Sequence, residues 1–203
     1  HTVELMAEKV KEVIDALKLE KINLLGHSLG GYVSLAFAEK FPEILESMTL
    51  FFSTTVADDE EKKAIRRRSI AVIDENFETF VKTSIPNLFS NNEKDILEGK
   101  IELAKNIAKS TNKEGVKAAQ LGMAERPDRT EILENLDAKI LIIAGKYDNA
   151  VKTENLLKII PEKTNIKTYV LDCGHNGHWE KPTICAEIIN TELFHNLPKH
   201  FLL

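Results

Sequence analysis

The stretch Gly26-His27-Ser28-Leu29-Gly30-Gly31 determines how this sequence folds. An apolar run over residues 22–25 precedes it, and a helical pattern over residues 32–38 follows it. A Gly-x-Ser-x-Gly pentapeptide between a strand and a helix is typical of a sharp, strained turn that projects the serine hydroxyl above a sheet. Because glycine has no Cβ, we expect Gly26 and Gly30 to let the two arms of this turn approach closely.

This turn gives three residues a predicted role. Ser28 is the candidate nucleophile. The backbone N–H of Leu29 lies at the N-terminus of the following helix, where a free donor and the helix dipole stabilise a developing oxyanion. His27 comes directly before the serine, and we expect its side chain to line a pocket or support the turn rather than transfer protons.

A candidate acid follows the clearest strand of the chain, residues 139–144. A serine hydroxyl needs a base to remove its proton, and that base is usually a histidine oriented by a carboxylate. Asp148 lies in the loop directly after this strand, and such loops carry catalytic groups. Two competitors are Asp137, which comes before the strand at the wrong end of the sheet, and Asp172, which lies cramped beside the histidine loop.

The candidate base lies in Cys173-Gly174-His175-Asn176-Gly177-His178. His175 follows a glycine at the start of the loop after the last strand, so a flexible backbone can bring its ring over the serine. His178 comes a turn later, and we expect it to be a packing or lid-facing side chain. A metal site built on these two histidines lacks further ligands at a suitable spacing, so we expect no metal. Serine, acid and histidine follow in an order known for such triads.

The rest of the chain alternates strands and helices. Apolar runs predict strands over residues 21–25, 47–52, 139–144 and 166–171, and helices are predicted after Thr2, after Gly31, over 153–160 and over 183–194. Strands separated by helices favour a parallel sheet. The expected fold class is therefore α/β, with a mostly parallel sheet.

Residues 54–136 interrupt this alternation with predicted helices over 59–74, 77–83, 94–109 and 113–124. Ligand sites in such sheets lie at the carboxyl ends of the strands, so we interpret the segment as a lid over a site. The alternative is a helical subdomain that only stabilises the fold. The predicted division is core 1–53, lid 54–136 and core 137–203. Within the lid, we expect Phe77, Phe80 and Phe89 to form its core rather than a substrate cage.

Composition restricts the function classes. The chain has 203 residues, of which 43% are hydrophobic and 29% charged, as in a globular domain. Its formal net charge of -5 argues against a nucleic-acid partner. The run containing Lys62, Lys63 and Arg66 to Arg68 follows acidic residues 58–61, so we expect a solvated helix face with pairs across turns. No apolar stretch approaches membrane-spanning length, so no membrane partner is expected.

The two cysteines, Cys173 and Cys185, have neither metal-ligand nor redox-motif spacing. We interpret them as ordinary thiols of a reducing compartment, and we expect a cytoplasmic protein, although a disulfide between them stays an alternative.

Taken together, these residues resemble the α/β-hydrolase fold superfamily. The resemblance rests on the turn around Ser28, on Gly145 and Asp148, and on Gly174-His175 with the trailing Glu180-Lys181-Pro182. It covers nearly the whole chain. Within the superfamily the chain is most similar to lid-bearing carboxylesterases and to their carbon–carbon hydrolase and cofactor-free haloperoxidase-like relatives.

The resemblance implies a serine hydrolase that acts on a small-molecule acyl substrate and uses no cofactor. Ser28 would attack the carbonyl and form an acyl-enzyme, and His175 would accept and return the proton. Asp148 would hold the imidazole in the correct tautomer, and the N–H of Leu29 would donate to the oxyanion. The alternative is a non-catalytic ligand-binding or receptor-type protein on the same fold, since fold does not fix function.

The chain departs from the family pattern at its start. Members of the family carry four strands and a helix ahead of this segment, with a turn that supplies a second oxyanion N–H. This chain begins His1-Thr2-Val3 without a methionine. We therefore expect a longer natural polypeptide. Without the earlier strands, residues 22–25 form an exposed apolar edge, which is predicted to pair with the missing N-terminal segment or to self-associate.

Overall fold

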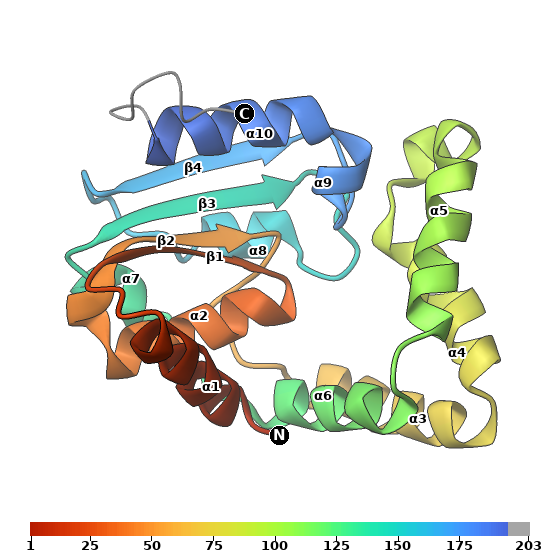
Figure 1. Ribbon diagram of the computed structural model, residues 1–203. Helices are drawn as coiled ribbons and strands as arrows, with labels where there is room; N and C mark the ends of the chain where they lie inside the picture. The colour runs from red at the N-terminus through yellow and green to blue at the C-terminus, as the bar shows by residue number, and fades with distance from the viewer. Residues whose placement is uncertain (195–203) are drawn as a thin grey trace.

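A four-stranded parallel sheet is the centre of the computed structural model, which describes residues 1–194. Its strands are β1 (Ile22–His27), β2 (Leu45–Phe51), β3 (Lys139–Gly145) and β4 (Ile166–Leu171), and they lie side by side in chain order (Figure 1). All three strand pairs are parallel, with Gly26 opposite Leu50 and Ile142 opposite Thr168. The predicted parallel sheet is confirmed.

Helices cover both faces of this sheet (Figure 1). One face packs against α1 (Val3–Ala16), α2 (Leu29–Lys40), α7 (Glu131–Asn135) and α8 (Thr153–Leu157), and the other packs against α10 (Pro182–Leu193). The strand β3 shows why: Ile140 and Ile142 belong to the first core, whereas Leu141 and Ile143 belong to the second. A parallel strand buried on both faces reads as a continuous apolar run.

Most element boundaries follow local signals. Thr2 caps α1 by accepting from the N–H of Leu5 (3.2 Å), and α2 ends at Lys40, ahead of the short helix η1 (Pro42–Ile44). The helix predicted over 153–160 is too long, because α8 ends at Leu157. Two short helices, α7 and α9 (Gly177–Glu180), are missing from the prediction, because four or five residues carry no readable helical period.

The predicted helices of residues 54–136 are present. They are α3 (Glu60–Glu75), α4 (Phe77–Ser84), η2 (Ile85–Leu88), η3 (Asn91–Glu93), α5 (Lys94–Lys109) and α6 (Lys113–Glu125). We call α3 to α6 the inserted helices. Asp59, Asn76 and Asn112 cap three of them with side-chain oxygens, which explains why their starts could be predicted.

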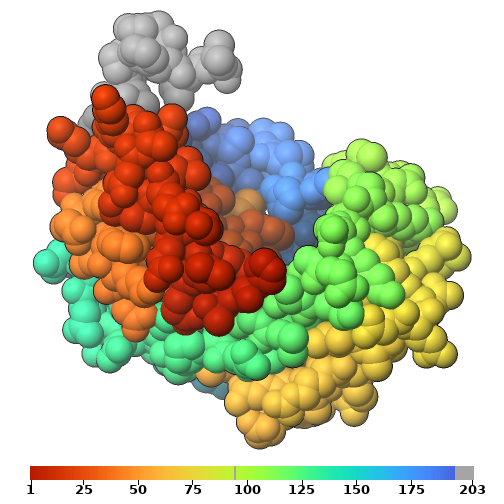
Figure 2. All heavy atoms as spheres, turned by 60° about the horizontal axis from the view of Figure 1, so that its bottom comes forward, coloured from red at the N-terminus to blue at the C-terminus, as the bar shows by residue number. Residues whose placement is uncertain are grey.

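The inserted helices lie beside the sheet (Figure 1). From another side, the start of α1 lies against the green segment that carries α6, with a hollow next to the contact (Figure 2). The backbone of His1 approaches Gly122 of α6 closely enough to exclude a Cβ there. The division into 1–53, 54–136 and 137–203 stays a prediction.

Strand β1 is an edge of the described sheet. Leu25 on this strand is 39% exposed, although it is apolar. Pairing of this edge with another segment, or with a second copy, stays a prediction. Across residues 1–194, none of the helices has both the length and the hydropathy that a bilayer crossing requires.

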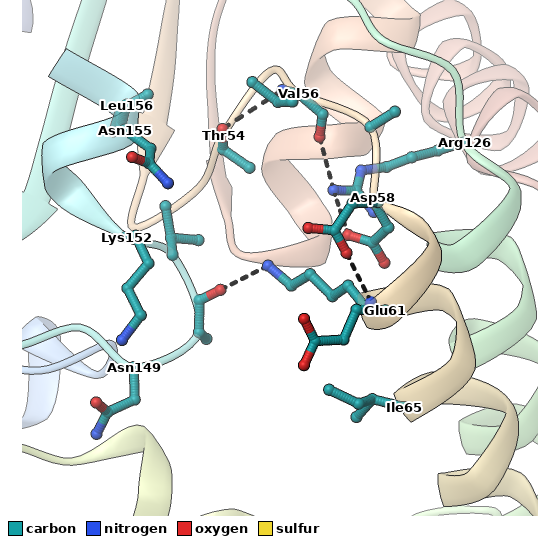
Figure 3. A pocket seen from close by; sticks show the side chains of 15 residues that line it. Thr54, Val56, Asp58, Glu61, Ile65, Arg126, Asn149, Lys152, Asn155 and Leu156 are labelled. Carbon is teal, nitrogen blue, oxygen red and sulfur yellow. Dashed lines mark hydrogen bonds and ion pairs between the residues drawn. The ribbon is translucent and has the colours of Figure 1, made fainter. Parts of the chain in front are cut away.

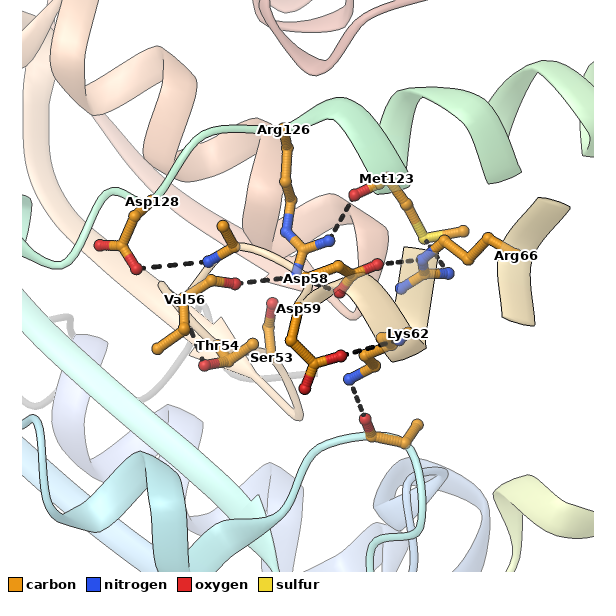
Figure 4. A network of polar contacts seen from close by, with 12 residues as sticks. Ser53, Thr54, Val56, Asp58, Asp59, Lys62, Arg66, Met123, Arg126 and Asp128 are labelled. Carbon is orange, nitrogen blue, oxygen red and sulfur yellow. Dashed lines mark hydrogen bonds and ion pairs between the residues drawn. The ribbon is translucent and has the colours of Figure 1, made fainter. Parts of the chain in front are cut away.

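A buried carboxylate joins the inserted helices to the core. Asp58 pairs with Arg66 of α3 and, at 2.9 Å, with Arg126 just after α6 (Figure 4). Arg126 also donates to the carbonyl of Val56 (2.8 Å) and lies over the ring of Tyr32 of α2, 3.8 Å from its centroid. Burial favours a raised pKa for Asp58, but its pairing with the two arginines holds that pKa below the ordinary value.

The expectation of a solvated basic face is therefore wrong for part of the run. Arg66 turns inward to Asp58, and Lys62 donates to the carbonyl of Ala150 at 2.8 Å. Lys63 follows the expectation, because it pairs across one turn with Glu60 at 2.7 Å. Helical spacing alone could not show which cations face the protein.

We expect Asp58→Ala to lower the free energy of unfolding by about 3–5 kcal/mol, because it leaves buried guanidinium groups without their carboxylate. The matched control is Asp74→Ala, which removes an exposed partner of Lys117 (2.6 Å). We expect the control to cost about 1 kcal/mol or less. Urea unfolding of both variants measures the difference, and equal losses would contradict the assigned role of Asp58.

Candidate active site

Ser28 lies at the turn between β1 and α2. Its backbone has φ 52° and ψ -114°, a left-handed region that a residue with a Cβ occupies only at a cost in strain. The N–H of Ser28 donates to the carbonyl of Phe51 (3.0 Å), and its carbonyl accepts from the N–H of Gly31 (2.9 Å) and from Ser53 Oγ (2.8 Å). These bonds hold the predicted turn in place.

The glycines of this turn differ in importance. A Cβ on Gly26 would overlap the carbonyl of Gly30, and one on Gly31 would overlap the Ser53 side chain. A Cβ on Gly30 would meet no atom within 4 Å, and the φ of Gly30 is not positive. The close approach therefore requires Gly26 and Gly31, and the expectation for Gly30 is wrong.

Three side chains form one hydrogen-bonded line. Nε2 of His175 lies 2.8 Å from Ser28 Oγ, and Nδ1 lies 2.7 Å from Asp148 Oδ2. Because the carboxylate oxygen accepts, Nδ1 carries the proton, and Nε2 is then free to accept from the serine hydroxyl. The fold thus brings together the three residues that the sequence singled out, from chain positions far apart.

Asp148 is positioned by its own loop after β3. Its Oδ1 accepts from the N–H groups of Ala150 (2.7 Å) and Val151 (2.8 Å), which leaves Oδ2 for the histidine. The competing Asp172 points to solvent and pairs with Lys146 at 3.2 Å. The other competitor, Asp137, precedes β3 and so lies at the opposite end of the strand.

The loop that carries His175 is held from two sides. The N–H groups of His175 and Asn176 donate to the carbonyl of Leu88 in η2 (3.0 and 3.1 Å). Buried Glu180 accepts from the N–H groups of Gly174 (3.0 Å) and Ser90 (3.1 Å). The sequence carries no local signal for this role of Glu180, because only the fold shows which N–H groups its carboxylate faces.

His27 and His178 pack together beside the triad. Their ring centroids lie 4.6 Å apart, and His27 Nε2 lies 3.1 Å from the carbonyl of His175. Since that carbonyl only accepts, Nε2 of His27 carries a proton. Burial lowers the pKa of His27 to about 4, so its ring is neutral at pH 7. These contacts place His27 against the histidine loop and His178 against His27, and the functional roles of both side chains stay predictions.

The N–H of Leu29 begins α2 and makes no hydrogen bond to another group in residues 1–194. It follows the serine directly, at the positive end of the helix dipole. This donor is therefore available for an oxyanion formed at Ser28.

A cavity of about 570 Å³ opens in front of Ser28 and His175. Much of its wall is apolar and comes from the inserted helices and η2, including Phe77, Phe80, Val81, Ile85, Leu88 and Val116. Phe77 and Phe80 stack with centroids 6.3 Å apart. The expectation that these two rings only form a helical core is wrong, whereas Phe89 is buried beside Leu97 and Ile101 as expected.

The glycines provide a matched test of the turn. We expect Gly26→Ala to lower the free energy of unfolding by several kcal/mol and to abolish any reactivity of Ser28, because the new methyl group overlaps backbone. Gly30→Ala meets open space, and we expect a change within about 1 kcal/mol. Urea unfolding of both variants tests this, and similar losses at both positions would refute the steric argument.

The low pKa of His27 predicts a pH dependence. In the unfolded chain His27 titrates near 6.5, so between pH 6.5 and about 4 the unfolded state binds a proton that the native state does not. Native stability therefore decreases as the pH falls through this window, by about 2 kcal/mol between pH 7 and pH 5. We expect His27→Gln, whose amide can still donate to the His175 carbonyl, to remove most of that decrease. Urea unfolding at both pH values checks this, and an unchanged pH dependence would contradict it.

Comparison with known proteins places this chain in a family. A sequence model of the alpha/beta hydrolase fold matches residues 1–182. A thermophilic esterase from Thermogutta terrifontis, solved with malate bound, is 32% identical, with a TM-score of 0.85 over 94% of this chain and 71% of that chain.

Two curated relatives are more distant. A Bacillus subtilis (strain 168) protein, provisionally named 2-succinyl-6-hydroxy-2,4-cyclohexadiene-1-carboxylate synthase, is 26% identical over 190 residues, or 88% of this chain and 68% of its own length. The 2-hydroxy-6-oxononadienedioate/2-hydroxy-6-oxononatrienedioate hydrolase of Escherichia coli (strain K12) is 26% identical over 185 residues, 87% of this chain. The chain spans 64% of that hydrolase.

These similarities support a hydrolytic function on this fold and do not favour the binding-only alternative. The family match covers residues 1–182, which include Ser28, Asp148 and His175. The chain belongs to the alpha/beta hydrolase fold family.

Proposed function

We propose that this protein is a serine hydrolase that cleaves an ester or a related acyl substrate through Ser28, His175 and Asp148. The observation that carries the proposal is the hydrogen-bonded line of these side chains, with links of 2.8 and 2.7 Å, at the mouth of an apolar cavity. A nucleophile, a base and an orienting carboxylate at these distances are what nucleophilic catalysis needs.

The proposed reaction has two halves. Nε2 of His175 takes the proton of Ser28 as Oγ attacks the acyl carbonyl, and the proton on Nδ1 stays in its bond to Asp148. The N–H of Leu29 donates to the oxyanion, and one such donor contributes roughly 3–4 kcal/mol to transition-state stabilisation. His175 then protonates the leaving group, and water repeats the sequence on the acyl-enzyme. These side chains supply every proton transfer, so the proposed mechanism uses no cofactor.

Ester cleavage is the leading reaction class. The Thermogutta terrifontis relative is an esterase by its title, and the Escherichia coli relative is named as a hydrolase of a dienedioate. The same three side chains also serve carbon–carbon hydrolysis, so both classes belong in a substrate screen. Most of the cavity surface is apolar, which suits an acyl chain of modest size.

A fluorophosphonate probe tests the nucleophile directly. We expect the probe to label Ser28 alone, as mapped by peptide mass spectrometry. We expect Ser28→Ala to lose labelling and to lower kcat on a p-nitrophenyl ester by about 10⁴- to 10⁶-fold, because the triad acts as a unit. Ser110→Ala is the control, since Ser110 is exposed at the end of α5.

The fold of the Ser28→Ala protein must be verified by its urea unfolding curve, which we expect to match the wild type. Turnover by folded Ser28→Ala at the wild-type rate would overturn the proposed nucleophile. Labelling of another serine would overturn the assignment of the site.

A further inference from the structure

The cavity in front of Ser28 has an unusual charge. Among the described residues that line it, the histidines aside, the charged side chains are Lys62 and Arg66, and none of its lining residues is a carboxylate. The chain as a whole carries a formal net charge of -5. A cavity lined by cations in an acidic protein is therefore a local feature of the fold and not a reflection of composition.

Lys62 is the freer of these two cations. It lies in the first turn of α3 and reaches across to the loop after β3, where Nζ donates to the carbonyl of Ala150 at 2.8 Å (Figure 4). Within residues 1–194, no carboxylate comes within ion-pair distance of Nζ. An ammonium has three donors, and this one uses a single protein acceptor.

The surroundings of Lys62 disfavour its charge. Burial lowers the pKa of its ammonium, and nearby Arg66 and Arg126 add repulsion, against attraction from Asp58 and Asp148. Asp58 already pairs with both arginines. Asp148 already accepts from His175 and two backbone N–H groups. A half-buried cation without a committed counter-ion is stabilised by an anion that enters the cavity.

Arg66 adds positive charge to the same cavity from one turn further along α3. It donates through Nε to Asp58 and through Nη1 to Gln120 Oε1 at 3.3 Å. The group formed by Lys62, Arg66, Arg126 and Asp58 has three cations and one carboxylate, a net charge of two positive units. Two of its cations line the cavity that contains Ser28.

Lys62 also separates this cavity from a second one. This second cavity is a groove of about 330 Å³ (Figure 3). Four residues line both spaces: Lys62, Ile65, Asn149 and Ala150. The acidic side chains of this region, Asp58, Asp59 and Glu61, line the groove instead of the Ser28 cavity. Arg126 and Lys152 line the groove as well, so together with Lys62 they balance its three carboxylates, whereas the Ser28 cavity has two cations and no carboxylate. An anionic group is therefore favoured on the Ser28 side of Lys62.

We infer that Lys62, with Arg66 behind it, binds a carboxylate carried by the substrate, so that the preferred substrate is an ester bearing a second, free carboxylate. This inference rests on the proposed ester hydrolysis at Ser28 and adds the substrate class. Lys62 is a specificity-determining residue in this assignment. It acts on the remote end of the substrate and not on the reacting carbonyl.

Paired substrates of matched shape test the inference. p-Nitrophenyl hemisuccinate and p-nitrophenyl 4-methylpentanoate differ by a carboxylate in place of an isopropyl group on the acyl side. 4-Acetoxybenzoate and 4-isopropylphenyl acetate differ in the same way on the leaving-group side. The quantity to measure is the ratio of kcat/KM for the anionic ester to kcat/KM for its neutral partner.

We expect Lys62→Met to lower this ratio about tenfold to a hundredfold for at least one pair, as expected for the loss of one charge-assisted hydrogen bond. Lys62→Arg should retain most of the preference. Lys63→Met is the matched control, because Lys63 is the next residue of α3 and pairs with Glu60 instead of lining the cavity. We expect the control to leave both rates unchanged.

The result that overturns the inference is an equal fall in both members of each pair, or an unchanged ratio. Either outcome would mean that Lys62 only positions the Ala150 loop. Calorimetric titration of Ser28→Ala with monomethyl succinate adds a readout that needs no turnover. We expect the additional Lys62→Met change to weaken that binding at least tenfold.

Failure of the proposed function is distinguishable from failure of the inference. If no ester is hydrolysed but monomethyl succinate binds in a Lys62-dependent way, the serine hydrolase proposal fails and the anion site stands. If neutral esters are hydrolysed at Ser28 and the ratio does not respond to Lys62, the hydrolase proposal stands and the anion site fails.

Discussion

The close approach of Gly26 to the backbone at Gly30 is the constraint that makes the site possible. It lets β1 pass into α2 through a single residue, Ser28, whose φ of 52° turns its hydroxyl out of the sheet. Because the strands are parallel, the loops that follow β3 and β4 begin at the same edge of the sheet as this turn, the edge formed by the carboxyl ends of the strands. Asp148 and His175 therefore reach the serine without any long excursion of the chain.

The histidine loop links the hydrogen-bonded line of Ser28, His175 and Asp148 to residues 85–90, which lie between the inserted helices α4 and α5. The carbonyl of Leu88 accepts from the N–H groups of His175 and Asn176, and Glu180 joins Gly174 to Ser90. The position of His175 thus depends on residues of η2 and the turn after it, and not only on the sheet. The segment that forms part of the cavity wall also helps to hold His175 in place.

Buried charge organises the rest of that segment. Asp58 neutralises part of the charge of Arg66 and Arg126, and the guanidinium of Arg126 lies on Tyr32 of the core. This cluster fixes the start of α3, and α3 in turn presents Lys62 to the cavity. The same network that stabilises the inserted helices therefore gives the cavity its positive charge.

Local signals in the chain were enough to predict the parallel α/β fold, the starts of the capped helices and the three residues of the hydrogen-bonded line. Those signals are apolar runs, capping residues, and a serine turn, an aspartate loop and a histidine loop in a known order. Three-dimensional packing was needed to show which glycines are sterically required, which cations of α3 face inward, and that Phe77 and Phe80 line the cavity. A contact between residues far apart in the chain has no local signature, because burial and charge compensation depend on what packs opposite.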